Sequence, residues 1–348
     1  MSSDSLVLRL EHCTGDCAQL VGGKAMGLGA LLRAGLQVPP GFAITTAAYR
    51  EHVARTGLAT QLQRLLADST TYEAQLRASE EIRNLFEASS PSAELAEEVL
   101  RVHAELCQPA ETPVAVRSSA SAEDMGDASF AGQQETYLWI LGGREVLRHV
   151  VRCWASLFTP QAIAYRAHLR TPLTDLAMGV VVQRMVPAEA AGVMLTIDPV
   201  TGDRSAIVIE AAYGLGAAVV NGEVNPDRVC VDKELLEIRS RSIGIKTVAY
   251  RFDPSTQGIR LEDVPRELQN KPCLRDAEII ELARLGKRME QAMGCSQDIE
   301  WAIGLGAGRA RELFLVQCRP ETVWSQKAAQ ALKSGTSAVT PRPLSSAS

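Results

Sequence analysis

The sequence lacks several features that would place a chain of 348 residues in a class at once. No uninterrupted apolar run is long enough to span a bilayer. The first residues, Met-Ser-Ser-Asp-Ser, have neither the basic start nor the apolar core of a secretory signal. Basic residues are not in excess: 36 Lys and Arg stand against 41 Asp and Glu, which argues against general nucleic-acid binding. We therefore expect a cytoplasmic protein that binds neither membranes nor nucleic acid.

Catalytic and metal-binding patterns built on cysteine or histidine are also missing. The eight cysteines are scattered, and only Cys13 and Cys17 lie close together, without the second pair that a zinc site needs. No Ser-His-Asp or Cys-His arrangement is suggested. The histidines fall in predicted helices or beside charged residues, at positions 12, 52, 103, 149 and 168. We expect reduced, core-filling thiols and histidines that are structural or exposed.

The pattern of apolar residues predicts an α+β protein of two or three subdomains. An N-terminal part, 1–177, combines a Gly-rich turn, a helical insert and a Ser/Gly-rich flap, and a C-terminal part, 178–324, ends in a hairpin. Residues 325–348 are rich in Ser, Ala, Thr, Lys and Pro, and we expect a tail or linker there. The periodicity predicts helices near 58–67, 72–88, 92–107, 143–168 and 275–293, and strands of one sheet near 178–186, 192–197, 206–211 and 228–231.

The final hairpin carries the most informative polar residues. Asp-Ile-Glu-Trp at 298–301 and Leu-Val-Gln-Cys-Arg-Pro at 315–320 read as two antiparallel strands. Glu300 and Gln317 should then lie on neighbouring strands within reach of one cation. Mg²⁺ prefers a few hard oxygen ligands together with substrate phosphates, so the pair predicts a magnesium site. Arg319 could neutralise charge on a phosphate being transferred.

Two upstream segments offer cations for an anion. Gly22-Gly-Lys24 precedes a predicted helix, so backbone amides and one ammonium could meet a phosphate, although the spacing is not that of a P-loop. A glycine turn with a solvated lysine is the alternative. Arg117 ends a Val-Ala-Val strand and leads into the polar loop 118–132. It could bind a polyphosphate with its planar fork, or pair with a carboxylate at the strand's edge.

Gln183 ends another apolar strand. There a side chain and backbone groups could contact an adenine edge, but by itself the segment also fits a place in the core. The rest of the pattern, rather than this residue, favours nucleotide binding.

Taken together, these segments resemble the N-terminal nucleotide-binding domain of the phosphoenolpyruvate synthase and pyruvate phosphate dikinase family, which rifampicin phosphotransferases share. The resemblance covers nearly all of 15–324. It rests on motifs in the family's order: Gly-Gly-Lys-Ala-Met-Gly-Leu-Gly at 22–29, Val-Pro-Pro-Gly-Phe at 38–42, Val-Arg-Ser-Ser-Ala-Ser-Ala-Glu-Asp at 116–124, Ser-Phe-Ala-Gly-Gln-Gln-Glu-Thr at 129–136, Ala-Gly-Val-Met at 191–194, Asp-Pro-Val-Thr-Gly at 198–202, Tyr-Gly-Leu-Gly at 213–216 and Gln-Cys-Arg-Pro at 317–320.

The resemblance implies an ATP-grasp-like fold, in which α+β subdomains clamp ATP together with Mg²⁺. It assigns roles by position: Lys24 and Arg117 match phosphate-binding cations, Gly132 and Thr136 a nucleotide-contacting flap, Gln183 an adenine-side position, Glu300 and Gln317 magnesium ligands, and Arg319 a residue beside the phosphates.

The resemblance also implies that part of the reaction takes place elsewhere. Family members use ATP to pyrophosphorylate a histidine on a separate domain, release AMP, and pass the remaining phosphate to an acceptor. That histidine lies in a Thr-Ser-His-type motif, which this sequence lacks. We therefore expect a histidine-bearing phosphocarrier subunit or domain as partner, with the small-molecule acceptor bound by that partner.

Three interpretations follow. The first is the ATP-binding catalytic subunit of a split dikinase-type phosphotransferase, organised like phenylphosphate synthase and with phenol as acceptor. The second is an ATP-binding fragment of a phosphoenolpyruvate synthase or rifampicin phosphotransferase. The third is a nucleotide-sensing module without turnover, against which the presence of every expected cation and metal-ligand position argues.

Overall fold

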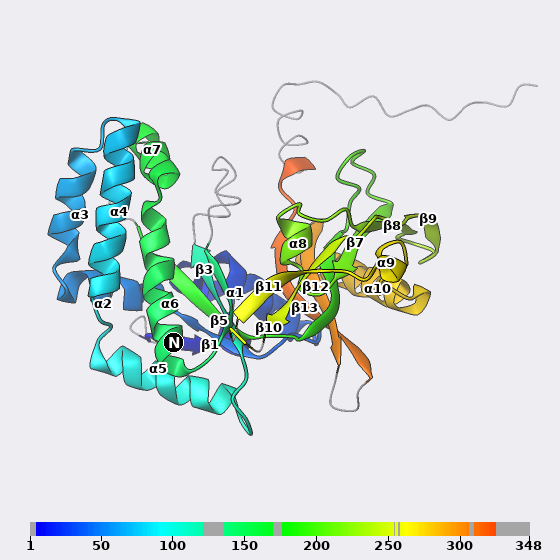
Figure 1. Ribbon diagram of the computed structural model, residues 1–348, viewed down its shortest axis with the longest axis horizontal. Helices are drawn as coiled ribbons and strands as arrows, with labels where there is room; N and C mark the ends of the chain where they lie inside the picture. Colours follow the sequence, from blue (N-terminus) through cyan, green and yellow to red (C-terminus); the bar gives the residue numbers. More distant parts are fainter. Residues whose placement is uncertain are drawn as a thin grey trace, which may run out of the picture.

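The computed structural model describes residues 5–120, 135–169, 176–253, 255–256, 258–305 and 310–324, and it shows a mixed α+β fold with two main sheets (Figure 1). The predicted tail 325–348 and most of the polar loop 118–132 lie outside these residues. No helix within the described ranges is both long and apolar enough to cross a membrane.

The first sheet has five strands in the order β1-β2-β5-β3-β4, with every neighbouring pair antiparallel. Its strands are β1 (Val7–Arg9), β2 (Gly41–Ile44), β3 (Val114–Ala120), β4 (Thr136–Ile140) and β5 (Met178–Arg184). A helical layer covers one face and shares a core with it: α2 (Thr46–Arg55), α3 (Leu58–Ala67), α4 (Tyr72–Ala88), α5 (Ala93–Leu106), α6 (Gly143–Ala155) and α7 (Pro160–Leu169).

The second sheet has six antiparallel strands in the order β13-β12-β6-β7-β8-β9. They are β6 (Ala188–Leu195), β7 (Ala206–Tyr213), β8 (Asp227–Asp232), β9 (Ile238–Ser242), β12 (Gln297–Leu305) and β13 (Arg311–Pro320). The long helix α10 (Asp276–Met293) packs on this sheet, and the short helices α8 (Ala217–Val220) and α9 (Arg266–Gln269) lie in its connections.

Helix α1 (Ala18–Arg33) lies between the two sheets (Figure 1). Its buried residues belong to one core with Val181 of the first sheet and with Trp301 and Leu315 of the second. Glycine makes this close packing possible: a Cβ atom at Gly27 would lie 2.0 Å from the carbonyl oxygen of Cys318 on β13. Helix α1 is therefore the element that brings the two sheets together.

A two-stranded ribbon, β10 (Val248–Asp253) and β11 (Gly258–Asp263), makes a second link between the halves. The ring of Phe252 stacks on that of Trp139 in β4, with 4.5 Å between ring centroids. Trp139 adopts a φ of 63°, a left-handed conformation that is costly for a bulky residue. The aromatic contact offsets part of that cost and ties the ribbon to the first sheet.

Several predictions from the sequence are confirmed, and others are wrong. The helices near 58–67, 72–88, 92–107 and 275–293 are present as α3, α4, α5 and α10, and the final hairpin is β12 with β13. The strand near 178–186 is not in the second sheet: β5 pairs with β2 and β3, so the sheets change after β5 rather than at 177/178. The helix predicted over 143–168 is two helices, because a 3-10 turn (Ser156–Phe158) precedes Pro160, which cannot continue the ladder.

The predicted Gly-rich turn is much shorter than expected. Gly22, with φ 73° and ψ 174°, interrupts α1, but the other glycines of the motif at 22–29 are helical. The cysteines behave as predicted: none of the eight forms a disulfide, and six of them are buried. The described residues contain no group of three or more His, Cys, Asp or Glu that could hold a metal.

Replacing Gly27 by alanine should destabilise the protein by about 1–3 kcal/mol, because backbone atoms of α1 and β13 must separate to admit the methyl group. Gly15→Ala is a matched control, since a Cβ atom at position 15 meets nothing within 4 Å. Urea unfolding of both variants measures the difference. Equal stabilities for the two variants would contradict the close packing of α1.

Burial of His52 predicts a pH-dependent stability. Its ring packs 5.0 Å from that of Trp154, and its Nε2 atom lies 2.8 Å from Ser89 Oγ. Desolvation, helped by nearby Arg55, lowers the His52 pKa from 6.5 to about 4. As pH falls, His52 therefore takes up its proton in the unfolded chain before it does so in the folded protein. The free energy of unfolding should fall by about 3 kcal/mol between pH 6.5 and pH 4.

His52→Gln tests this, because glutamine retains a donor for Ser89 but does not titrate. Unfolding free energies measured between pH 7 and pH 4 should fall less steeply for the variant than for the wild type. Identical slopes would show that His52 does not carry this dependence.

Candidate functional site

The β12–β13 hairpin places the predicted metal ligands side by side. Glu300 and Gln317 are direct cross-strand partners, and Asp298 and Arg319 pair two positions further along the same ladder. The register then shifts after Glu300, so Val316 has no partner on β12. This β-bulge leaves the Val316 carbonyl group to bond outside the hairpin.

Arg117 reaches this hairpin from β3 of the other sheet. Its Nη1 atom donates to Val316 O at 3.0 Å, and its Nη2 atom donates to Glu300 Oε2 at 2.9 Å and to Gln317 Oε1 at 2.6 Å. The Arg117 side chain is 10% exposed. Of the two roles predicted for Arg117, the structure shows the pairing with a carboxylate. That carboxylate belongs to Glu300, which is also the predicted metal ligand. We call these four residues, Arg117, Glu300, Val316 and Gln317, the junction.

Lys24 lies beside the junction. Its Nζ atom donates to Ser118 O at 2.8 Å, one residue along β3 from Arg117, and the side chain is 8% exposed. The alternative of a solvated lysine is therefore wrong. Ser119 fixes the same end of α1 to β3, because its hydroxyl donates to Val21 O at 2.7 Å. The kink at Gly22 allows this contact: a Cβ atom there would lie 2.1 Å from Ser119 O.

The remaining predicted residues take different places. Thr136 is exposed and lies opposite Arg117 in the β3–β4 ladder. Gln183 is 3% exposed, and its Nε2 atom donates to Pro39 O at 3.2 Å, so its side chain supports the chain before β2. Contact of Gln183 with adenine stays a prediction. Gly132 lies outside the described residues.

Arg319 is close to the junction in register but is not part of it. Its Nε and Nη2 atoms donate to Asp298 Oδ2 at 3.0 and 2.8 Å, and its side chain is 54% exposed. Burial raises the pKa of Asp298, while the Arg319 charge opposes that rise. Sequence reasoning placed Asp298 on the strand but gave it no role. The alternation of Asp298 and Glu300 on one face of β12 is the signal that could have done so.

Glu210 is a second residue that sequence reasoning missed. Across the second sheet, Glu300 lies opposite Val193 on β6, and Val193 lies opposite Glu210 on β7. Cross-strand partners share a face, so Glu210 belongs to the Arg117-facing side of the sheet. Arg228 on β8 holds it with an Nη1–Oε1 distance of 3.1 Å. A lone polar residue in the apolar strand 206–213 is the signal that could have identified it.

Lys24 and Arg117 are buried where the two sheets meet, beside the oxygens of Glu300 and Gln317. Buried cations of this kind are typical of sites that bind anionic ligands. Comparison with known proteins agrees. A family model described as pyruvate phosphate dikinase, AMP/ATP-binding domain, matches residues 18–338. The chain belongs to this family of ATP-binding domains.

Three relatives of about 40% identity are each named as a phosphoenolpyruvate synthase or a probable one. The chain is 40% identical over 345 residues to a probable phosphoenolpyruvate synthase of Staphylothermus marinus, covering 92% of this chain and 41% of that protein. It is 41% identical over 355 residues to the phosphoenolpyruvate synthase of Aeropyrum pernix, covering 94% and 43%. It is 39% identical over 318 residues to a probable phosphoenolpyruvate synthase of Methanocaldococcus jannaschii, covering 90% and 26%. The chain thus spans less than half the length of these relatives.

The junction predicts a large coupling energy between Arg117 and Glu300. In a double-mutant cycle with Arg117→Ala and Glu300→Gln, we expect about 1–3 kcal/mol of coupling, because the hydrogen bond is charged and largely buried. The cycle of Arg319→Ala with Asp298→Asn is the control. That pair has an exposed arginine, so its coupling should stay below about 1 kcal/mol.

Both cycles are measured by urea unfolding of the four proteins in each set. A junction coupling no larger than that of the Arg319–Asp298 pair would show that Arg117 does not join the two sheets energetically.

Proposed function

We propose that this chain is the ATP-activating part of a phosphoenolpyruvate synthase-type phosphotransferase, with an ATP-grasp-like site between its two sheets. The observation that carries the proposal is the junction. A guanidinium group from one sheet meets a carboxylate and an amide oxygen from the other, beside a buried lysine. The family of ATP-binding domains to which the chain belongs supports the choice of ATP as ligand.

The residues present fit a magnesium ion. Glu300 and Gln317 supply two hard oxygens from adjacent strands, and two protein ligands leave room for phosphate oxygens and water, as Mg²⁺ prefers. These two residues would hold the ion, which supplies neutralisation of charge on a polyphosphate. The Nε–H group of Arg117 is buried and has no hydrogen-bond partner within the described ranges, so the guanidinium group keeps a donor for an incoming oxygen.

The residues of the chain would act on ATP through position and charge. Lys24 and Arg117 are fixed by α1 and β3, so their charges are in place before a phosphate arrives. Arg319 is more exposed and could follow a phosphoryl group as it moves. Phosphoryl transfer depends mainly on such positioning and electrostatic stabilisation.

The phosphoryl acceptor in this proposal is a histidine on another domain or subunit. Within the chain, His52 and His103 are buried, and the His149 ring packs against Tyr137. None of these three lies at the junction. The name of the relatives favours the second interpretation, in which the final product is phosphoenolpyruvate, over the phenol-phosphorylating subunit. The small-molecule acceptor would bind to the partner.

The test uses ATP labelled at the β-phosphate, with Mg²⁺, the pure chain, and the proteins that co-purify with it from its native cells. We expect acid-labile label on a partner histidine with AMP formed in equal amount, and little AMP from the chain alone. Lys24→Ala and Arg117→Ala should lower labelling about 100-fold or more, as loss of one preorganised charge does in other enzymes.

Arg284→Ala is the matched control, because Arg284 is an exposed arginine of α10 that pairs with nearby Glu281. Its labelling rate should equal that of the wild type. Rapid AMP release by the pure chain would contradict a separate acceptor. Tight ATP binding without transfer to any protein would favour the sensing module.

A further inference from the structure

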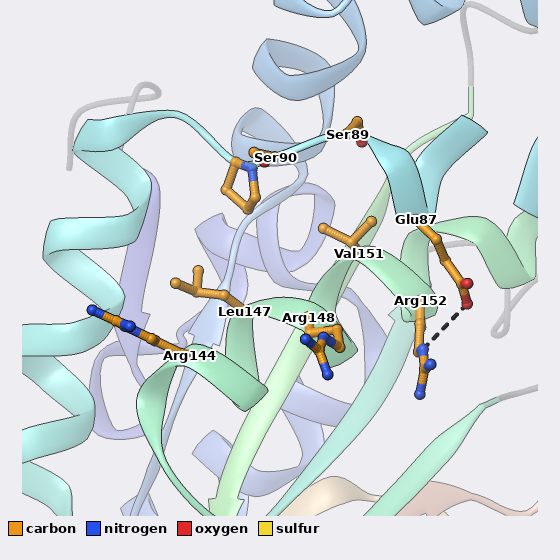
Figure 2. A pocket seen from close by; sticks show the side chains of 9 residues that line it. Glu87, Ser89, Ser90, Arg144, Leu147, Arg148, Val151 and Arg152 are labelled. Carbon is orange, nitrogen blue, oxygen red and sulfur yellow. Dashed lines mark hydrogen bonds and ion pairs between the residues drawn. The ribbon is translucent and has the colours of Figure 1, made fainter. Parts of the chain in front are cut away.

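The helical layer has a surface pocket. Its lining includes none of the residues discussed above as ligands of ATP or Mg²⁺. It lies between α6 and the segment that joins α4 to α5, and its volume is about 350 Å³ (Figure 2). Its lining consists of Glu87, Ser89, Ser90, Pro91, Arg144, Leu147, Arg148, Val151 and Arg152. The lining thus contains three arginines and one carboxylate, in a chain whose net charge is −5.

The arginines form a stripe along α6. Arg144, Arg148 and Arg152 follow one another at intervals of four residues, which places them on one face of the helix. Like charges at this spacing repel, so the stripe lowers helix stability unless negative charge lies near it. Figure 2 shows Leu147 and Val151 between the stripe and the Ser89–Ser90 segment, and both are almost fully buried. The pocket therefore combines a cationic rim with an apolar floor.

Neutralisation of the stripe within the protein is incomplete. Arg152 pairs with Glu87 at 3.2 Å, and Arg148 pairs with Glu145 on its own helix at 3.2 Å. Arg144 forms no ion pair or hydrogen bond within the described part of the chain. Arg148 is 65% exposed, so its pair with Glu145 is weak and can exchange for a better acceptor.

The wall opposite the stripe is held rigidly. The hydroxyl of Ser89 donates to Phe86 O at 2.6 Å and contacts buried His52 at 2.8 Å. The carbonyl of Ser90 accepts from Arg55. A wall fixed by these contacts loses little conformational entropy when a ligand binds.

We propose that this pocket binds a small phosphate ester, at a site separate from the ATP site. Arginine forks match the oxygens of a phosphate group and bind it in a bidentate manner. The apolar floor suits a short carbon skeleton, and the volume lies at the lower end of small-molecule sites. This binding site goes beyond the proposed function and does not depend on it.

The opposite face of α6 connects the pocket to the first sheet. Trp154 on that face donates from Nε1 to Met178 O of β5 at 3.2 Å, and α6 packs on β3, the strand that carries Arg117. The pocket and the junction therefore lie on opposite sides of one sheet. A ligand in the pocket cannot touch ATP, so the two sites can be altered independently.

Calorimetric titration of the full chain with glycerol 3-phosphate tests the proposal. The wild type should bind this probe, whereas uncharged glycerol should not bind. The double variant Arg144→Ala/Arg148→Ala should bind about tenfold or more weakly, because it loses charged hydrogen bonds to the phosphate. Both side chains are exposed, so the variant should fold, and circular dichroism checks this.

Two controls separate this pocket from other sites. Arg284→Ala removes an exposed arginine that pairs with Glu281, three residues before it, just as Arg148 pairs with Glu145. This variant should bind glycerol 3-phosphate with unchanged affinity. Lys24→Ala alters the ATP site and should also bind glycerol 3-phosphate as the wild type does. The proposal is overturned if the wild type shows no binding at millimolar probe, if the double variant binds normally, or if Lys24→Ala abolishes binding.

Discussion

The hydrogen bonds of the Arg117 guanidinium group are the interaction on which the rest of the site depends. They join β3 of one sheet to β12 and β13 of the other, at a β-bulge that turns the Val316 carbonyl toward them. The planar guanidinium group holds a backbone oxygen and two side-chain oxygens with donors in a fixed fork, whereas the donors of lysine lie on one nitrogen at the end of a flexible stem. The sheets must come close for this contact, and the missing Cβ atoms of Gly22 and Gly27 in α1 allow it.

Both buried cations in this region have hydrogen-bond acceptors within the protein. Glu300 neutralises Arg117, while Lys24 donates to the carbonyl group of Ser118. Arg319 and Asp298 neutralise each other in the neighbouring pair. Burying a charge is costly unless hydrogen bonds compensate, and the carbonyl groups of Ser118 and Val316 do so here. The arrangement therefore suits the anionic ligand that we propose for this site.

Much of the fold could be predicted from the sequence because its signals are local. The helices α3 to α5 show their amphipathic period, and the two-residue period of β12 and β13 brings Glu300 and Gln317 together. The sheet to which β5 belongs could not be predicted, because an apolar run does not indicate which strands will pair with it. Nor could the bulge at Val316 or the approach of Gly27 to Cys318, because both depend on distant backbone. The motif at 22–29 predicted a glycine turn before a helix, but the turn is limited to Gly22 and the remaining glycines are helical.

Strand β3 shows why the helical layer matters to a site it does not touch. Val114 and Val116 point into the core shared with that layer, whereas Arg117 points to the second sheet. Strand alternation links these two facts: a slip of one residue would bury Arg117 among the helices. The register is secured by seven consecutive pairs with β5, from Val114 opposite Arg184 to Ala120 opposite Met178. The apolar core thus determines that the Arg117 side chain points toward the second sheet. The contacts of the junction therefore depend on the packing of α6 against the opposite face of β3.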